Sequence, residues 1–259
     1  MSSKLYESFL SKNPSPQERL SLGKSIRKQV SRSSIAEFNI TNKRQSPIDI
    51  LLEQEKTRIP EYIPIRHARM AANPFAFFRG GAAIMANDLN GLPSPPIKVQ
   101  LCGDMHVSNF GFFSTTEHQL VFGINDFDET LPGNFDWDLK RLVASAMIAS
   151  QLLGQDQAYG EMIIRNIVTT YRNNLHYYGD IPFLDLKRSY IDENALLSAA
   201  TIHANPSSQK YLQRLLNKAR QNDNQGLIGK ITELTPMGMR LIEKPPLIEH
   251  LTTSVHGEN

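Results

Sequence analysis

Four polar residues between positions 104 and 128 have the types and spacing of a site that holds a metal ion and phosphate. Asp104 is followed five positions later by Asn109, and two further acids, Asp126 and Asp128, come 22 and 24 residues after Asp104. A phosphoryl-transfer site needs a carboxylate that orients the attacking hydroxyl and oxygen ligands for Mg²⁺. The pattern therefore predicts Asp104 as the catalytic base and Asn109, Asp126 and Asp128 as metal ligands.

The segments around these residues predict how they are brought together. Residues 97–101 read as a strand that leads into Gly103-Asp104, and residues 111–113 and 119–124 read as two short strands joined by a polar turn. A hairpin of this length places Asp104, Asn109 and Asp126 at one end of a small sheet. On a strand Asp126 and Asp128 share a face, where their carboxylates repel unless a cation lies between them; a loop end would instead leave both in water.

The rest of the chain reads as mostly helical, which gives an α+β fold class. Helical patterns cover residues 16–30, 48–59, 63–70, 136–153 and 159–177, and one more helix, capped by Asn73, continues through Met85. Leu131-Pro-Gly-Asn134 reads as a turn. We expect an N-terminal helix with a flexible lead over residues 1–46, a main domain over 47–232, and a poorly ordered tail over 233–259.

Three further side chains are candidates for the same site. His106 could act in catalysis, bind a metal, shape the loop, or be a neutral structural histidine. Arg79 could bind a phosphate as a bidentate donor or form an ion pair with one of the acidic loops. Arg141 could bind a phosphate of the cofactor or a carboxylate, or could form a structural ion pair.

Composition excludes several classes of protein. The 28 basic residues nearly balance the 26 acidic ones, and the net charge of +2 argues against a nucleic-acid-binding protein. The single cysteine, Cys102, excludes an intramolecular disulfide and favours a reducing compartment. The sequence has no run of about 18 apolar residues, so we expect no transmembrane helix. The N-terminus lacks the apolar core of a signal peptide. We therefore expect a cytoplasmic protein with no membrane partner.

The acidic motifs resemble those of small-molecule kinases with the protein-kinase-like fold. Aminoglycoside and choline kinases carry His-Gly-Asp-x-His-x-x-Asn, Ile-Asp-Phe-Asp and Tyr-Asp-Leu, and the corresponding segments here are Gly103–Asn109, Asn125–Asp128 and Trp137–Leu139. The resemblance implies a kinase-like catalytic lobe whose small β-hairpin carries the acidic site, with Mg²⁺ and ATP as cofactors. It also implies that Asp138 braces the catalytic loop. Cys102 stands where those kinases have the leading His.

A wider stretch is similar to a bacterial family, domain-of-unknown-function family 2252, itself thought to be a distant relative of the kinase-like fold. Five motifs occur in the family's order, at 66–70, 74–80, 102–111, 125–129 and 137–142. The resemblance is strong over residues 60–150. It also implies that longer members continue into a glycine-rich segment and a Lys-Glu pair after a Pro-Pro like Pro245-Pro246. This chain contains no glycine-rich phosphate-loop motif, which leads us to expect a truncated or divergent member.

Three functions remain open at this point. The first is a Mg²⁺-dependent, ATP-using phosphotransferase that acts on a small molecule. The second is a metal-dependent hydrolase of the phosphatase type. The third is a non-catalytic kinase-like module that binds a small molecule, a nucleotide or a partner protein, and the missing glycine-rich loop favours it.

Overall fold

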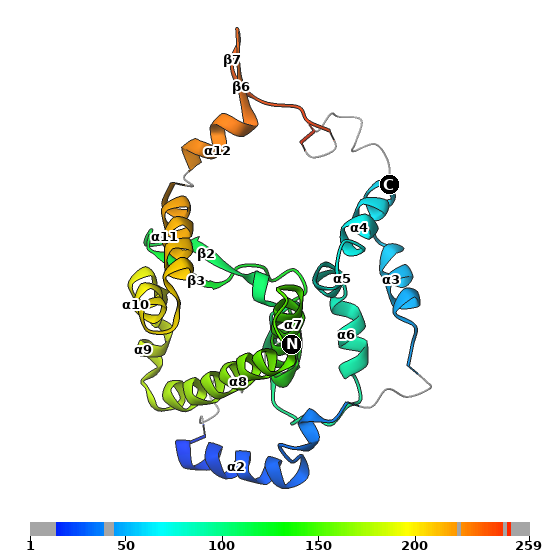
Figure 1. The fold of residues 1–259 in the computed structure, drawn as a ribbon, viewed down its shortest axis with the longest axis vertical. Helices are drawn as coiled ribbons and strands as arrows, with labels where there is room; N and C mark the ends of the chain where they lie inside the picture. The colour runs from blue at the N-terminus through cyan, green and yellow to red at the C-terminus, as the bar shows by residue number, and fades with distance from the viewer. Residues whose placement is uncertain (1–13, 39–43, 222–223, 246–247, 250–259) are drawn as a thin grey trace, which may run out of the picture. The chain divides into compact units, whose positions relative to one another are not determined.

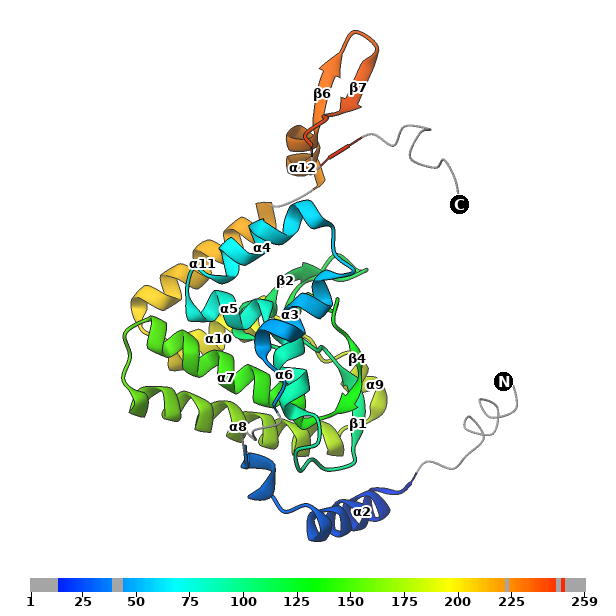
Figure 2. The same cartoon turned by 90° about the vertical axis from the view of Figure 1, so that its right-hand side faces the viewer.

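The computed structural model describes residues 14–38, 44–221, 224–245 and 248–249, which form a mostly helical chain with small β-sheets (Figures 1 and 2). The expected α+β class is confirmed. Contacts divide the chain into two compact units: unit 1 comprises Met1–Gly111 and Ile124–Arg188, and unit 2 comprises Phe112–Gly123 and Ser189–Asn259. The sequence placed boundaries elsewhere, after residues 46 and 232.

Unit 1 begins, within the described residues, with helix α2, Pro16–Gln29. Its start carries a capping box, because the Ser15 hydroxyl accepts a hydrogen bond from the Glu18 amide at 3.3 Å and the Glu18 carboxylate accepts one from the Ser15 amide at 2.7 Å. The 3-10 helix η1, Ser34–Ala36, follows. Residues 1–13 and 39–43 of the segment expected to form the flexible lead and N-terminal helix lie outside the described residues.

Four short helices follow in unit 1, and the 3-10 helix η2, Pro60–Tyr62, precedes the second of them. They are α3 (Pro47–Glu55), α4 (Ile63–Met70), α5 (Pro74–Gly80) and α6 (Ala82–Leu89). Of these, α3, α4 and α6 contribute to a hydrophobic cluster, in which Ile50, Leu51, Met70 and Ile84 are buried together with Ala83 packed against them. A Cβ at Gly80 would lie 2.6 Å from Met70 Cγ, so glycine is needed for this close packing.

The single helix expected from Asn73 through Met85 is instead two helices. Asn73 caps α5 as predicted, since its side-chain oxygen accepts a hydrogen bond from the Ala76 amide at 2.8 Å. Gly81, with φ −106° and ψ 28°, then ends α5 before α6 begins. The prediction of one helix was wrong because two consecutive glycines have low helix propensity, and the apolar spacing continued across the break.

A two-stranded sheet lies next to the predicted catalytic loop. Strand β1, Lys98–Leu101, pairs antiparallel with β4, Leu131–Asn134, with Leu101 opposite Leu131. The prediction of a turn at residues 131–134 was wrong. Pro132 is tolerated because the sheet has only edge strands, and Gly133 leaves the space that the Leu101 side chain occupies.

Three helices complete unit 1: α7 (Asp136–Leu152), α8 (Gln157–Asp180) and α9 (Phe183–Lys187). The first two match the predicted helices closely and pack side by side (Figures 1 and 2). Gly160 of α8 is buried, and a Cβ there would lie 2.9 Å from the Ser150 hydroxyl of α7. The glycine thus lets the two helix backbones approach closely.

Unit 2 contains the predicted hairpin and mostly C-terminal elements. Strands β2 (Phe110–Ser114) and β3 (Leu120–Ile124) are neighbours in one sheet, and β5 (Ile191–Asp192) pairs antiparallel with β3. Helices α10 (Glu193–His203), α11 (Pro206–Gln221) and α12 (Asn224–Ile231) follow.

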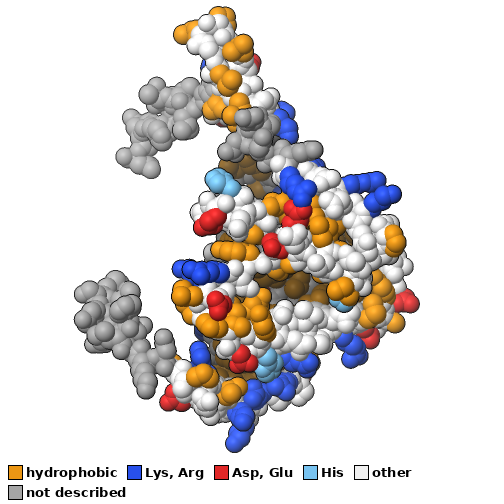
Figure 3. Space-filling view, turned by 90° about the vertical axis from the view of Figure 1, so that its left-hand side faces the viewer, with side chains coloured by type: hydrophobic (Ala, Val, Ile, Leu, Met, Phe, Trp, Pro, Cys, Tyr) orange, Lys and Arg blue, Asp and Glu red, His pale blue; other side chains and the backbone are white. Residues whose placement is uncertain are grey.

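A second hairpin in unit 2 is formed by β6, Thr232–Thr235, and β7, Gly238–Leu241. The sequence pattern did not indicate it, and it falls in the stretch that we expected to be poorly ordered. Figure 3 shows hydrophobic side chains on this hairpin, where the exposed fractions of Leu234, Met237 and Met239 are 84%, 99% and 67%. No described helix combines the length and apolar character needed to cross a membrane.

Candidate functional site

The predicted catalytic loop follows directly from strand β1. Gly103 adopts φ +87°, which is the left-handed region that favours glycine, and it turns the chain at the end of the strand. A Cβ at this position would collide with the Glu129 carbonyl oxygen, so the loop and the acidic segment 126–129 meet at Gly103. The loop then passes through the 3-10 helix η3, Val107–Asn109, and enters β2.

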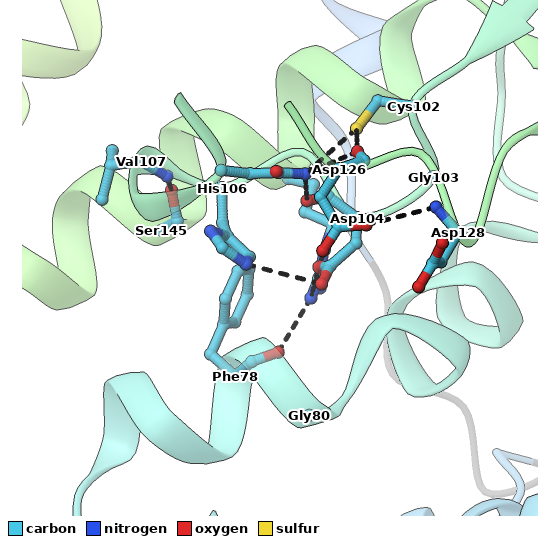
Figure 4. Close-up of polar contacts among 12 residues, drawn as sticks. Phe78, Gly80, Cys102, Gly103, Asp104, His106, Val107, Asp126, Asp128 and Ser145 are labelled. Carbon is cyan, nitrogen blue, oxygen red and sulfur yellow. Dashed lines mark hydrogen bonds and ion pairs between the residues drawn. The ribbon is translucent and has the colours of Figure 1, made fainter. Parts of the chain in front are cut away.

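Asn109 ties the loop to the acidic segment. Its side-chain amide group donates hydrogen bonds to the backbone carbonyls of Asp104 and Asp126, each at 3.1 Å (Figure 4). The Cys102 thiol donates to the same Asp126 carbonyl at 3.4 Å. Asn109 is 4% exposed. The structure therefore brings three of the predicted residues, Asp104, Asn109 and Asp126, into one connected group.

Helix α7 supplies a second set of contacts from one face. Asp138, Arg141 and Ser145 are spaced by three and four residues, which places them on the same side of a helix. The Asp138 carboxylate accepts hydrogen bonds from the amides of Cys102 at 2.7 Å and Gly103 at 3.1 Å. The brace implied for Asp138 is thus present.

Ser145 acts at the far end of the same loop. Its hydroxyl accepts a hydrogen bond from the Val107 amide at 3.1 Å and donates to the Leu142 carbonyl at 2.6 Å, and its side chain is fully buried (Figure 4). The sequence reasoning missed this residue. A serine four residues after Arg141, on a face that already carried Asp138, was the available signal.

Both carboxylate oxygens of Asp104 have partners. The Arg141 guanidinium donates to Oδ1 from Nε at 2.6 Å and also contacts it through Nη2, while His106 Nε2 lies 3.4 Å from Oδ2 (Figure 4). Burial alone would raise the pKa of Asp104, but the His106 hydrogen bond and the Arg141 charge outweigh it and lower the pKa below its ordinary value. Asp104 is therefore held as a carboxylate.

Arg141 forms the ion pair that the sequence left as one alternative. It is 2% exposed, donates through Nη2 to the Phe78 carbonyl at 2.8 Å, and stacks over the Phe78 ring at 4.3 Å from the ring centroid. It thereby links the loop that carries Asp104 to helix α5. Arg79, the other predicted phosphate ligand, is exposed on α5 and has no hydrogen-bonded or ionic partner among the described residues.

His106 is buried beside this ion pair, with 5% of its surface exposed. Its ring packs edge-to-face against Phe75, with the two ring centroids 6.2 Å apart. Within the described part of the chain, its Nδ1 atom has no hydrogen-bond partner. The imidazole therefore faces Asp104 on one side and an apolar surrounding on the other, as a residue that shapes the loop would.

The acidic segment is a turn after β3 and not a strand. The Asp128 amide donates to the Asp126 carboxylate at 3.3 Å, and both side chains are exposed. The expectation that they share a strand face was wrong, because β3 ends at Ile124 and the chain turns at once. The loop-end alternative, with both carboxylates in water, is the one observed.

Negative charge is concentrated around this turn. The pKa of Glu129 is raised, first by burial and then by the charges of Asp104, Asp126 and Asp128. The pKa of Asp138 is also raised by burial. The hydrogen bonds that it accepts from the Cys102 and Gly103 amides partly offset this increase. Four carboxylates within electrostatic reach of one another favour a bound cation.

The oxygen donors here suit a hard divalent ion. The Asp126 and Asp128 carboxylates are exposed, and the Asn109 carboxamide oxygen makes no hydrogen bond in the described structure. The described residues contain no group of three His, Cys, Asp or Glu side chains in a metal-binding arrangement. Magnesium is commonly bound through one or two carboxylates, with waters and substrate phosphates as its other ligands, so these residues fit it.

Comparison with known families assigns the chain. The model of a family described as "Uncharacterized protein conserved in bacteria (DUF2252)" matches residues 58–258, and the chain therefore belongs to this family. The matched range contains the loop, the acidic turn and helix α7. No curated protein and no solved structure was found to match.

Proposed function

We propose that this chain is a Mg²⁺-dependent, ATP-using phosphotransferase with the architecture of a kinase-like catalytic lobe, acting on a small hydroxylated molecule. The observation that carries the proposal is the Asn109 side-chain amide, which bonds the backbone of Asp104 and of Asp126 at once. It joins the residue proposed to orient the acceptor to the residue proposed to bind metal, as phosphoryl transfer requires.

Each residue has a defined task in the proposed reaction. Asp104, kept ionised by Arg141 and His106, accepts a hydrogen bond from the acceptor hydroxyl and aligns its oxygen with the γ-phosphate. A strongly basic group is not needed, because the transition state is loose and positioning dominates. Asn109, Asp126 and Asp128 would hold the magnesium ion, which neutralises charge on the phosphates.

Residues outside this group act by keeping it rigid. Asp138 and Ser145 fix the backbone of the loop at Cys102, Gly103 and Val107, so Asp104 is presented from a constrained segment. Small displacements of reacting groups carry a large cost in rate. This arrangement supports a catalytic use of the loop.

One observation favours the second candidate, a non-catalytic binding module. Both oxygens of the Asp104 carboxylate are already engaged by protein groups, as a purely structural ion pair would be. In that case the acidic turn would still bind a metal-nucleotide complex, and Asp104 would serve only to hold α7 against the loop.

Thermal unfolding of the purified chain with ATP and Mg²⁺ tests the proposal. A ligand that binds only the folded state raises its stability according to its concentration relative to Kd. We expect a stabilisation that needs both ATP and Mg²⁺, that is lost in Asp126→Ala, and that persists in Asp180→Asn, a control at an exposed carboxylate on α8. Absence of any shift at millimolar MgATP would contradict the proposal.

Turnover separates the two candidates. Release of ADP is measured with a panel of hydroxylated small molecules, for the wild-type chain and for Asp104→Asn. A phosphotransferase should lose at least about 100-fold in rate in Asp104→Asn while the MgATP-dependent stabilisation remains. MgATP binding without ADP release in the wild-type chain would instead favour the binding module.

A further inference from the structure

Unit 1 contains a large apolar cavity that the proposed phosphotransfer does not use. Its volume is about 700 Å³, and it is lined by helices α5, α6 and α7, by Val168 of α8 and by residues 32–38. Its apolar wall includes Phe77, Phe78, Ile84, Val143 and Ile148. The cavity is partly open to solvent, and small-molecule sites are clefts or cavities of about 300–1,000 Å³. The volume is thus that of a ligand site.

Most charged residues of the cavity wall form ion pairs, either within the wall or with residues outside it. Asp136 forms an ion pair with Lys140 at 2.8 Å and accepts a hydrogen bond from Ser94. Asp88 receives two hydrogen bonds from Arg44, at 2.6 and 2.7 Å. The other charges apart from Arg141 are those of Arg32 and Glu37, which are exposed and opposite in sign. This balance of charge matches an uncharged ligand.

Arg141 is the one buried cation in the described cavity wall, and it has spare donor capacity. Its Nε atom bonds Asp104 and its Nη2 atom bonds the Phe78 carbonyl, whereas the one hydrogen-bond partner of Nη1 among the described residues is the Met85 sulfur, at 3.8 Å. A thioether is a weak acceptor. Arg141 and Met85 both line the cavity. An oxygen acceptor on a ligand that reached Nη1 would satisfy this donor better than the sulfur does.

We propose that this cavity binds an uncharged small molecule that has an apolar body and one hydrogen-bond acceptor oxygen. The inference is independent of the proposed phosphotransferase activity, since it rests on the cavity and on its paired charges. Arg141 belongs both to the cavity wall and to the contacts of the Asp104 loop, because it bonds Asp104 and also contacts Met85.

Fluorescence titration of the full-length chain with N-phenyl-1-naphthylamine, an uncharged apolar probe, tests the site. We expect saturable binding with one probe per chain, weakened at least tenfold in Ala144→Phe and in Ile148→Trp. These residues line the cavity one helical turn apart on α7. Gln151→Phe, at an exposed position of the same helix, is the matched control and should bind as the wild-type chain does.

Two further measurements keep the outcome interpretable. Far-ultraviolet circular dichroism confirms that each variant is folded, and Met237→Ser removes an apolar side chain from the exposed hairpin, where the probe could also attach. Equal binding by the wild-type chain and both cavity variants, or loss of binding in Met237→Ser, would overturn the proposal. Absence of saturable binding to the wild-type chain would overturn it as well.

Competition against the bound probe tests the acceptor oxygen. 1-Acetonaphthone carries a carbonyl group that naphthalene lacks, while the two share the same apolar body. We expect 1-acetonaphthone to displace the probe at a concentration several-fold lower than naphthalene does. Displacement at equal concentrations would overturn the acceptor part of the proposed ligand class.

Discussion

At the scale of single residues, the site is organised around the Asp104–Arg141 ion pair. The guanidinium is almost fully buried and also binds the Phe78 carbonyl and ring. Removing one partner of a buried ion pair leaves the other charge uncompensated, which strongly lowers the free energy of unfolding. Replacing both partners by apolar residues changes that free energy much less. Arg141 therefore matters for stability whether or not Asp104 takes part in catalysis.

Arg141→Ala should lower the free energy of unfolding by about 3–5 kcal/mol, because Asp104 and the Phe78 carbonyl both lose their donor. Arg141→Lys should restore little, since an ammonium group cannot bond both acceptors with the same fork geometry. Urea denaturation followed by circular dichroism measures the effect. Arg172→Ala, at an exposed position on α8, is the control and should change stability by less than about 0.5 kcal/mol. A loss below about 1 kcal/mol in Arg141→Ala would contradict the assigned role.

At the scale of elements, one face of α7 fixes the loop of residues 102–107. Asp138 and Ser145 accept hydrogen bonds from backbone amides at the two ends of the loop. Arg141 binds the Asp104 carboxylate, which lies between these ends in the sequence. The conformation of the loop therefore depends in part on a helix that begins about thirty residues later in the chain. Removing these hydrogen bonds should therefore destabilise both the helix and the loop.

Ser145→Ala should lower the free energy of unfolding by about 1–3 kcal/mol, because the Val107 amide loses its acceptor in a buried site. Ser150→Ala is a matched control two residues from the end of the same helix. Ser150 is also buried, but its hydroxyl donates only to the Met147 carbonyl of its own helix. We expect a smaller loss for Ser150→Ala, below about 1 kcal/mol. Equal losses in the two variants, measured by urea denaturation, would show that the Val107 bond is unimportant.

Substitutions at two glycines distinguish the free-energy cost of a left-handed backbone conformation from the cost of a steric clash. Gly103 and Gly91 have φ values of +87° and +85°, but an added Cβ meets the Glu129 carbonyl at Gly103 and open space at Gly91. Gly91→Ala should cost about 1–2 kcal/mol, the cost of the left-handed conformation. Gly103→Ala should cost at least about 1 kcal/mol more, since the loop must also move away from the acidic turn. Similar losses of thermal stability would contradict the close approach at Gly103.

At the scale of the whole molecule, the chain divides into two compact units, each assembled from segments that are distant in sequence. The candidate site and the apolar cavity belong to unit 1. Unit 2 exposes apolar residues on the hairpin of β6 and β7, and exposed apolar patches commonly mark interaction surfaces or sites of self-association.

Leu234→Ser combined with Met237→Ser should leave the free energy of unfolding within about 0.5 kcal/mol of the wild-type value, because both side chains are exposed. The same variant should self-associate less at high concentration, which sedimentation velocity measures. Leu216→Ser on α11 is the contrasting change, since Leu216 is fully buried, and it should destabilise the chain by about 2–5 kcal/mol. Strong destabilisation by the hairpin substitutions would show that these residues pack against other parts of the protein.

The sequence by itself determined the local elements and the residues of the candidate loop. Capping signals and apolar periodicity predicted α2, α4, α7 and α8, because these depend on neighbours within a few residues. The spacing of Asp104, Asn109 and Asp126 predicted their grouping, because the hairpin between them is short. Such features are local and therefore readable from one chain.

Only the tertiary structure decided which partners these residues meet. The strand at residues 131–134 exists because β1 pairs with it, although Pro132 and Gly133 are typical of turns. Arg141 is buried because α5 supplies the Phe78 carbonyl and ring from more than sixty residues away. The apolar cavity is likewise lined by helices that are separate in sequence, and it is partly open to solvent. Contacts of this kind arise when segments that are distant in sequence pack together, so local sequence patterns do not predict them.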